Sequence, residues 1–99
     1  INIEESIFQI IKKSLIMAVE SFDGTAKATK ISGLKIGGKT GTSQNPHGDN
    51  HSIFIGYLNQ DNKPPLTMVV LVENGGMGSG IATQIARKMF QKYSGKIHE

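Results

Sequence analysis

Apolar side chains near the start of the chain recur at the spacing of one face of a helix. The recurring positions are Ile3, Ile7, Ile11, Leu15, Ala18, Val19 and Phe22. Recurrence every three or four residues predicts an amphipathic helix over residues 3–22. Gly24 is expected to break this helix. The polar segment 25–33 that follows has room for one helical turn, around residues 26–29.

The middle of the chain changes to strand-like patterns. Residues 34–43 alternate loosely, HSIFIGYL at 51–58 reads as a second strand, and LTMVVLVE at 66–73 reads as a third. The runs NPHGDN and NQDNKPP between them are dense in turn-forming residues. Connections this short cannot make parallel crossovers, so we expect an antiparallel meander.

A second helical pattern follows the glycine-rich loop NGGMGSG at 74–80. Its apolar positions are Ile81, Ala82, Ile85, Ala86, Met89, Phe90 and Tyr93. Ser79 is expected to cap the start of this helix and Gly95 to end it. The sequence therefore predicts an α+β fold, in which a three-stranded antiparallel sheet is packed by an N-terminal and a C-terminal helix.

The predicted sheet has more apolar surface than two helices cover easily. The nearly continuous apolar run of the third strand indicates burial on both of its faces. Two arrangements satisfy this pattern. Either one helix lies on each face, or one face was built to meet something absent from this chain.

Length, composition and charge narrow the possible functions. A chain of 99 residues forms one domain at most, or a piece of one, with a small core. The net charge of +3 is spread along the chain, which gives only a weak electrostatic case for nucleic acid. The apolar runs are far shorter than the roughly 20 residues of a membrane span. Cysteine is absent, which excludes disulfides and thiolate metal sites. We therefore expect no cofactor, no nucleic acid and no membrane contact from this segment.

The stretch GLKIGGKTGT at 33–42 fits two kinds of motif. Gly33 to Thr40 matches G-x-x-x-x-G-K-[ST], the phosphate-binding loop of nucleotide hydrolases, and Lys39 to Gly41 spells K-T-G. A phosphate loop needs a buried strand before it and a helix that begins at its Lys-Thr pair. The approach at 27–32 is polar and the continuation at 41–46 is rich in turn formers, so the sequence disfavours a nucleotide-binding module.

The K-T-G box on a strand has a different physical logic. An extended peptide can pair with the backbone of an exposed strand edge, and Gly41 lets it approach closely. Lys39 supplies a positive charge, while the hydroxyls of Thr40 and Thr42 can donate to a carboxylate. Backbone N–H groups at the end of the strand can hold a developing oxyanion. These features suit a peptide that ends in a carboxylate.

The stretches GGKTGTSQNPHG at 37–48, HSIFIGY at 51–57, LVENGG at 71–76 and IARKMF at 85–90 resemble a known family. That family is the class B penicillin-binding proteins, and the similar region is the C-terminal part of their transpeptidase domain. The turn Asn45-Pro46-His47-Gly48 looks most like the elongation-type members. The resemblance extends from about Ile7 to Tyr93.

The resemblance implies an activity and roles for individual residues. The parent protein would be a peptidoglycan D,D-transpeptidase that cross-links stem peptides through a serine acyl-enzyme, binds β-lactams and acts outside the cytoplasm. Lys39 would assist proton and charge handling around the nucleophile, and Thr40 and Gly41 would line the catalytic cleft. Thr42 and Ser43 would bind substrate. Thr42 would contact the terminal carboxylate and lend its N–H to the oxyanion hole.

Two further sequence motifs of this family, S-x-x-K and S-x-N, do not occur upstream of K-T-G in this chain at the positions that the family uses. The family's nucleophile belongs to an S-x-x-K helix far upstream of K-T-G, whereas Ser32 to Lys35 fits those letters immediately before the box. Ser43 to Asn45 fits S-x-N but follows the box instead of preceding it. Both matches are interpreted as chance. We therefore expect residues 1–99 to be a fragment that holds one wall of an active site, is inactive alone and has the remainder of the domain as partner.

Three alternatives to this interpretation use other features of the chain. A nucleotide-binding module would use Gly33 to Thr40, and a non-catalytic interaction module would use an exposed sheet face. A metal site would use His47 and His51, which have H-x-x-x-H spacing. Pro46 and Gly48 prevent that pair from sharing a helix, so a solvated turn without metal is the expected structure there.

Overall fold

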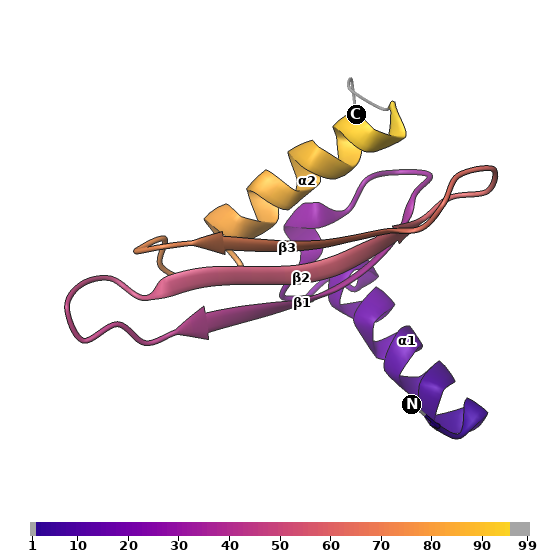
Figure 1. The fold of residues 1–99 in the computed structure, drawn as a ribbon, viewed down its shortest axis with the longest axis horizontal. Coiled ribbons are helices and arrows are strands. Elements are labelled where there is room, and N and C mark those ends of the chain that lie inside the picture. Colours follow the sequence, from indigo (N-terminus) through magenta and orange to yellow (C-terminus); the bar gives the residue numbers. More distant parts are fainter. Residues whose placement is uncertain (1, 96–99) are drawn as a thin grey trace.

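The computed structural model describes residues 2–95. These residues form two α-helices, one short 3₁₀ turn and three β-strands (Figure 1). Their order is α1 (Glu5–Glu20), η1 (Lys27–Thr29), β1 (Lys35–Ser43), β2 (His51–Asn59), β3 (Leu66–Val72) and α2 (Ile81–Ser94). The predicted α+β architecture is confirmed. In this part of the chain, neither helix has the length and apolar character needed to span a bilayer.

The three strands form an antiparallel meander in the order β1-β2-β3. In its register, Lys39 lies opposite Ile55 and Thr42 lies opposite Ser52. Because cross-strand partners point to the same side of a sheet, this register assigns each side chain to one of two faces. It also makes β1 an edge strand, with β2 on one side and no strand on its other side within residues 2–95.

One face of the sheet packs against α2 and carries the core. Phe54 of β2 meets Phe90 of α2 with its ring centroid 6.3 Å away and the ring planes at 84°, an edge-to-face contact that aromatic pairs favour. Both rings are completely buried. The other buried apolar residues of the sheet and α2 are Ile36, Leu58, Met68, Val70, Ala82 and Ala86. Alternate strand positions thus supply a continuous apolar layer beneath α2.

The opposite face of the sheet is largely open. Ile55, Val69 and Leu71 point to it and are 54%, 68% and 57% exposed. Helix α1 packs against β1 and η1, and its N-terminal half runs away from the sheet (Figure 1). The structure therefore places α2 on one face, while α1 reaches the other face only at residues such as Leu15 and leaves Ile55, Val69 and Leu71 exposed.

Helix α1 is shorter than its apolar periodicity predicts. It begins at Glu5 and ends at Glu20, and Phe22 is 90% exposed instead of continuing the buried stripe. The chain leaves the helix at Ser21 in an extended conformation and doubles back, so that the N–H of Ala26 donates to the carbonyl of Ala18 at 2.9 Å. This return contact ends the helix before Phe22 can reach the core.

The sequence predicts the end of α2 correctly but not the residue that caps its start. Gly80, and not Ser79, is the N-cap residue, and as a glycine it has no side chain with which to cap the helix. The hydroxyl of Thr83 instead shares its one proton between the carbonyls of Gly80 and Ser79, at 2.7 and 3.0 Å. At the other end, Gly95 takes φ = 83° and closes the helix as predicted.

Two glycines of β1 differ in the space around them, which gives a matched pair of substitutions. A Cβ on Gly38 would lie 2.5 Å from Cζ of Phe54 and 3.1 Å from the carbonyl oxygen of Ile55, whereas a Cβ on Gly41 would meet only Cβ of Ile53, at 3.7 Å. We expect Gly38→Ala to lower the free energy of unfolding by about 1–3 kcal/mol through overpacking. Gly41→Ala should change it by less than about 0.5 kcal/mol. Chemical denaturation of both variants measures this difference, and equal losses would contradict the packing of Phe54 over Gly38.

Candidate active site

The K-T-G residues lie in the middle of β1, which continues to Ser43. Residues 35–40 of the suspected phosphate loop are therefore extended strand, and no helix begins at Lys39 or Thr40 in the described chain. A phosphate loop requires that helix, because the N–H groups at its start face the anion. The strand at these residues therefore contradicts the alternative in which Gly33 to Thr40 forms a nucleotide-binding loop.

All five predicted site residues lie together on the C-terminal half of β1, but they are divided between its two faces. Lys39, Gly41 and Ser43 share the open face, since their partners across the sheet are Ile55, Ile53 and His51. Thr40 and Thr42 point to the α2 side, opposite Phe54 and Ser52. The outer backbone edge of β1 runs between these two sets.

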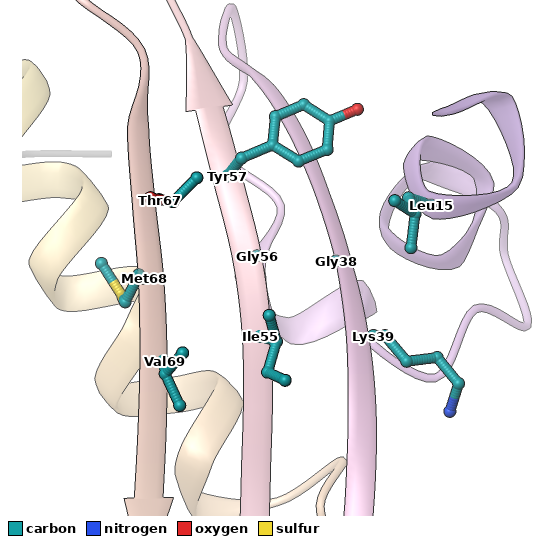
Figure 2. A pocket seen from close by; sticks show the side chains of 9 residues that line it. All are labelled: Leu15, Gly38, Lys39, Ile55, Gly56, Tyr57, Thr67, Met68 and Val69. Carbon is teal, nitrogen blue, oxygen red and sulfur yellow. The ribbon is translucent and has the colours of Figure 1, made fainter. Parts of the chain in front are cut away.

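The side chain of Lys39 is exposed at that edge. Its ammonium donates to the carbonyl of Thr40 at 2.6 Å, and Figure 2 shows it pointing past β1, away from Ile55. The one ion pair within residues 2–95 joins Lys30 to Glu20 at 3.4 Å, so no described carboxylate neutralises Lys39. A hollow of about 320 Å³ adjoins Lys39 on the open face, bounded by Leu15, Ile55, Tyr57 and Val69 among others (Figure 2).

Thr42 is held by the glycine-rich loop at 74–80. Its hydroxyl oxygen accepts a hydrogen bond from the N–H of Gly78 at 2.9 Å. Gly78 itself is buried against the backbone of Gly41. The glycines between positions 75 and 80 indicate that this loop can pack closely against another backbone. The sequence does not indicate that the other backbone is that of β1.

Hydrogen bonds from amide and imidazole groups hold the turn after β1. Asn45 donates through Nδ2 to Oδ1 of Asn74 at 2.8 Å and to the carbonyl of Asp49 at 3.1 Å. His51 uses Nδ1 to accept the backbone N–H of Asn74 at 3.0 Å. Over residues 2–95, no group of three or more His, Asp and Glu side chains is arranged to hold a metal ion.

The two other motif matches do not form catalytic elements. Ser32 lies in the turn before β1 and Lys35 begins that strand, so the pair does not share a helix face. Ser43 ends β1, and Asn45 is engaged with Asn74 and Asp49. Neither match therefore has the placement that the family's motif requires, because Ser32 and Lys35 are not on a helix and Ser43 to Asn45 follows the K-T-G box.

Tyr57 closes one end of the hollow beside Lys39. Its ring covers Gly37, where a Cβ would lie 2.6 Å from the ring carbons. The phenolic oxygen is buried and makes no hydrogen bond within the described residues. Burial raises the pKa of Tyr57 above its ordinary value of 10.0, because ionisation would place an unsolvated charge there.

Comparison with known proteins adds to this geometry. The family model for the penicillin binding protein transpeptidase domain matches residues 1–91. A solved structure of the D,D-transpeptidase domain of a peptidoglycan glycosyltransferase from Eggerthella lenta matches with 29% sequence identity and a TM-score of 0.62. That match covers 87% of this chain and 20% of the other, so the chain spans about a fifth of that structure's length. None of the curated proteins compared with the chain matches it.

Replacement of Tyr57 by Phe tests the unpartnered phenol. Removing a hydroxyl that makes no hydrogen bond should leave the free energy of unfolding at pH 7 unchanged or slightly higher. Tyr93→Phe is the matched control, since the hydroxyl of Tyr93 donates to the carbonyl of Pro64 at 3.0 Å. We expect that control to lose about 0.5–1.5 kcal/mol. Equal losses in the two variants, measured by chemical denaturation, would contradict this account of Tyr57.

The raised pKa of Tyr57 also predicts a pH dependence. The folded state favours the neutral phenol, so the folded pKa lies above that of the unfolded chain, about 10. The stability linked to this difference is present below pH 10 and is lost as the pH rises through the folded pKa. The wild-type chain should therefore lose more stability above pH 10 than Tyr57→Phe does. Parallel loss in the two proteins would show that the phenol ionises as freely in the fold as outside it.

Proposed function

Because the chain belongs to the penicillin-binding protein transpeptidase domain family, we propose that it forms the K-T-G wall of a serine D,D-transpeptidase active site. The proposed reaction cross-links peptidoglycan stem peptides, and β-lactams acylate the same site. The turn Asn45 to Gly48 supports assignment to the elongation-type class B proteins. The parent enzyme is proposed to act outside the cytoplasm, where its polymeric substrate is assembled.

This proposal rests on Lys39, an exposed lysine that has no carboxylate partner within residues 2–95 and lies on a strand whose outer edge no described strand pairs with. A stem peptide can lie along that edge and pair with the outer backbone groups of β1. The ammonium of Lys39 then lies beside the reacting carbonyl, and the hydroxyl of Thr42 reaches the terminal carboxylate. Ser43 extends the same binding edge by one residue, and the N–H of Thr42 is the proposed oxyanion donor.

The nucleophile is proposed to come from a part of the domain outside this chain. Its serine oxygen attacks the carbonyl before the terminal D-alanine, the peptide bond breaks, and D-alanine leaves with the proton. The amine of a second stem peptide then attacks the ester and releases the serine. A β-lactam follows the first step only, because its opened ring stays attached. Lys39 stabilises negative charge and relays protons, while Thr40 and Gly41 shape the cleft.

The open sheet face supports the view that residues 1–99 are a fragment of this domain. Ile55, Val69 and Leu71 form an exposed apolar strip beside the hollow at Lys39. Surfaces of this kind normally meet another part of a protein. We propose that the remainder of the transpeptidase domain covers this strip and places its serine next to Lys39.

Labelling with a fluorescent penicillin tests the proposed function. The 99-residue chain alone should take up no covalent label, whereas the full-length product of its gene should be labelled. In the full-length protein, Lys39→Ala should slow acylation by about 100-fold or more, since general acid–base groups typically contribute that much. Lys35→Ala is the matched control, because Lys35 lies on the same strand and the same face.

Several outcomes would overturn the proposal. Covalent labelling of the isolated chain would place a nucleophile within it. Equal acylation rates for Lys39→Ala and Lys35→Ala would remove Lys39 from the reaction. A full-length protein that neither reacts with β-lactams nor cross-links stem peptides would favour a non-catalytic interaction module.

A further inference from the structure

Residues 74–80, here called the glycine brace, connect β3 to α2 and tie down the ends of β1 and β2. The brace lies at the same end of the sheet as the hairpin between β1 and β2 (Figure 1). Five hydrogen bonds join it to that end: Asn45 Nδ2 to Asn74 Oδ1, Asn74 N to His51 Nδ1, Gly76 N to Asn50 O, Gly78 N to Thr42 Oγ1 and Ser52 Oγ to Met77 O. The brace is therefore built against the substrate-facing strand.

The bond from Gly78 determines what the hydroxyl of Thr42 can do. A hydroxyl has one proton to donate and two lone pairs to accept with. The N–H of Gly78 occupies a lone pair at 2.9 Å. No described residue accepts the proton of this hydroxyl, and the side chain of Thr42 is exposed. Accepting one bond strengthens the hydroxyl as a donor, so the proton is available to an anion at the edge of β1.

Position 78 requires glycine for a steric reason. A Cβ there would lie 2.7 Å from both the nitrogen and the carbonyl carbon of Gly41, well inside van der Waals contact. Gly41 has the opposite surroundings, with space for a Cβ on the open face. The close approach of these two backbones is what brings the N–H of Gly78 within reach of Thr42.

Ser52 holds the brace in this position from the neighbouring strand. It lies opposite Thr42 in the register and is completely buried. Its hydroxyl donates to the carbonyl of Met77 at 2.8 Å and accepts the N–H of Ala82 at 3.3 Å. Ser52 thus links the brace to the start of α2 immediately behind the Gly78–Thr42 bond.

We propose that Gly78 is a positioning residue for substrate carboxylate recognition, acting through the hydroxyl of Thr42. The N–H of Gly78 directs that hydroxyl to donate outward, to the carboxylate of a stem peptide or β-lactam. Ser52 supports this arrangement by fixing Met77. The proposal rests on the proposed function, in which Thr42 contacts that carboxylate.

The test compares a penicillin with its methyl ester, which lacks the negative charge, in the full-length product of the gene. The readout is the ratio of the two acylation rate constants, acid over ester. The wild-type protein should prefer the acid, and Gly78→Ala should lower the ratio by about tenfold, as expected for a lost hydrogen bond to a charged group. Ser79→Ala is the matched control in the brace, since Ser79 is exposed and keeps the carbonyl that Thr83 uses.

A double-mutant cycle separates positioning from general structural damage. Thr42→Val removes the hydroxyl while keeping the shape of the side chain, and it should lower the ratio by itself. Gly78→Ala should then have no further effect on the ratio in the Thr42→Val protein, because its route of action is gone. Ser52→Ala, which creates no steric overlap, should give a smaller loss of the ratio than Gly78→Ala.

Each result bears on one claim. If the wild-type protein is not acylated by either compound, the proposed function fails before the brace is tested. If it is acylated without preference for the acid, or if Gly78→Ala keeps the wild-type ratio, the positioning role is overturned. A further drop of the ratio from Gly78→Ala in the Thr42→Val background would also overturn it. Should Gly78→Ala fail to fold, Ser52→Ala decides the question, and a wild-type ratio in that variant would overturn the proposal.

Discussion

The pairing of β1 with β2 is the constraint on which the candidate site depends. It holds Lys39 to Ser43 in an extended conformation and fixes which side chains face α2. Because β1 pairs on one side only within the described residues, its other edge keeps backbone groups that a peptide can use. A helix at the same residues would have consumed those groups internally and pointed them at a phosphate instead. The strand geometry alone therefore separates the two interpretations of the shared lysine.

The glycines around Lys39 serve different purposes, which the motif alone does not reveal. Gly38 and Gly56 leave the space that the ring of Phe54 fills, so they are required by the core beneath α2. Gly41 has no such neighbour, and the packing of this chain does not demand a glycine there. Under the proposed function, the missing side chain of Gly41 is explained by the approach of a ligand to the strand.

The sequence predicted the elements well where the signal was local. Alternation and turn-forming runs located all three strands, and the apolar stripe ending at Gly95 located α2. It failed where distant contacts decide the structure. Phe22 continues the helical stripe of α1, but the return of Ala26 onto Ala18 ends the helix first. The bond between Thr42 and Gly78 joins positions 36 residues apart and leaves no local pattern. Periodicity therefore found the strand that carries the site, but not the segment that holds it.

The direction of the Lys39 side chain and the exposure of the open sheet face are independent observations. Both indicate that the missing part of the site approaches from the open side of the sheet. Along β1, the neighbours of Lys39 at Gly38 and Thr40 point to the α2 side, so this strand cannot supply a nucleophile adjacent to the ammonium. A serine that reaches Lys39 has to approach from the open face or past the edge of β1. The open face is also where Ile55, Val69 and Leu71 remain exposed. Under the proposed function, a single packing event would bury this apolar strip and complete the catalytic site, so domain assembly and acylation would depend on the same surface.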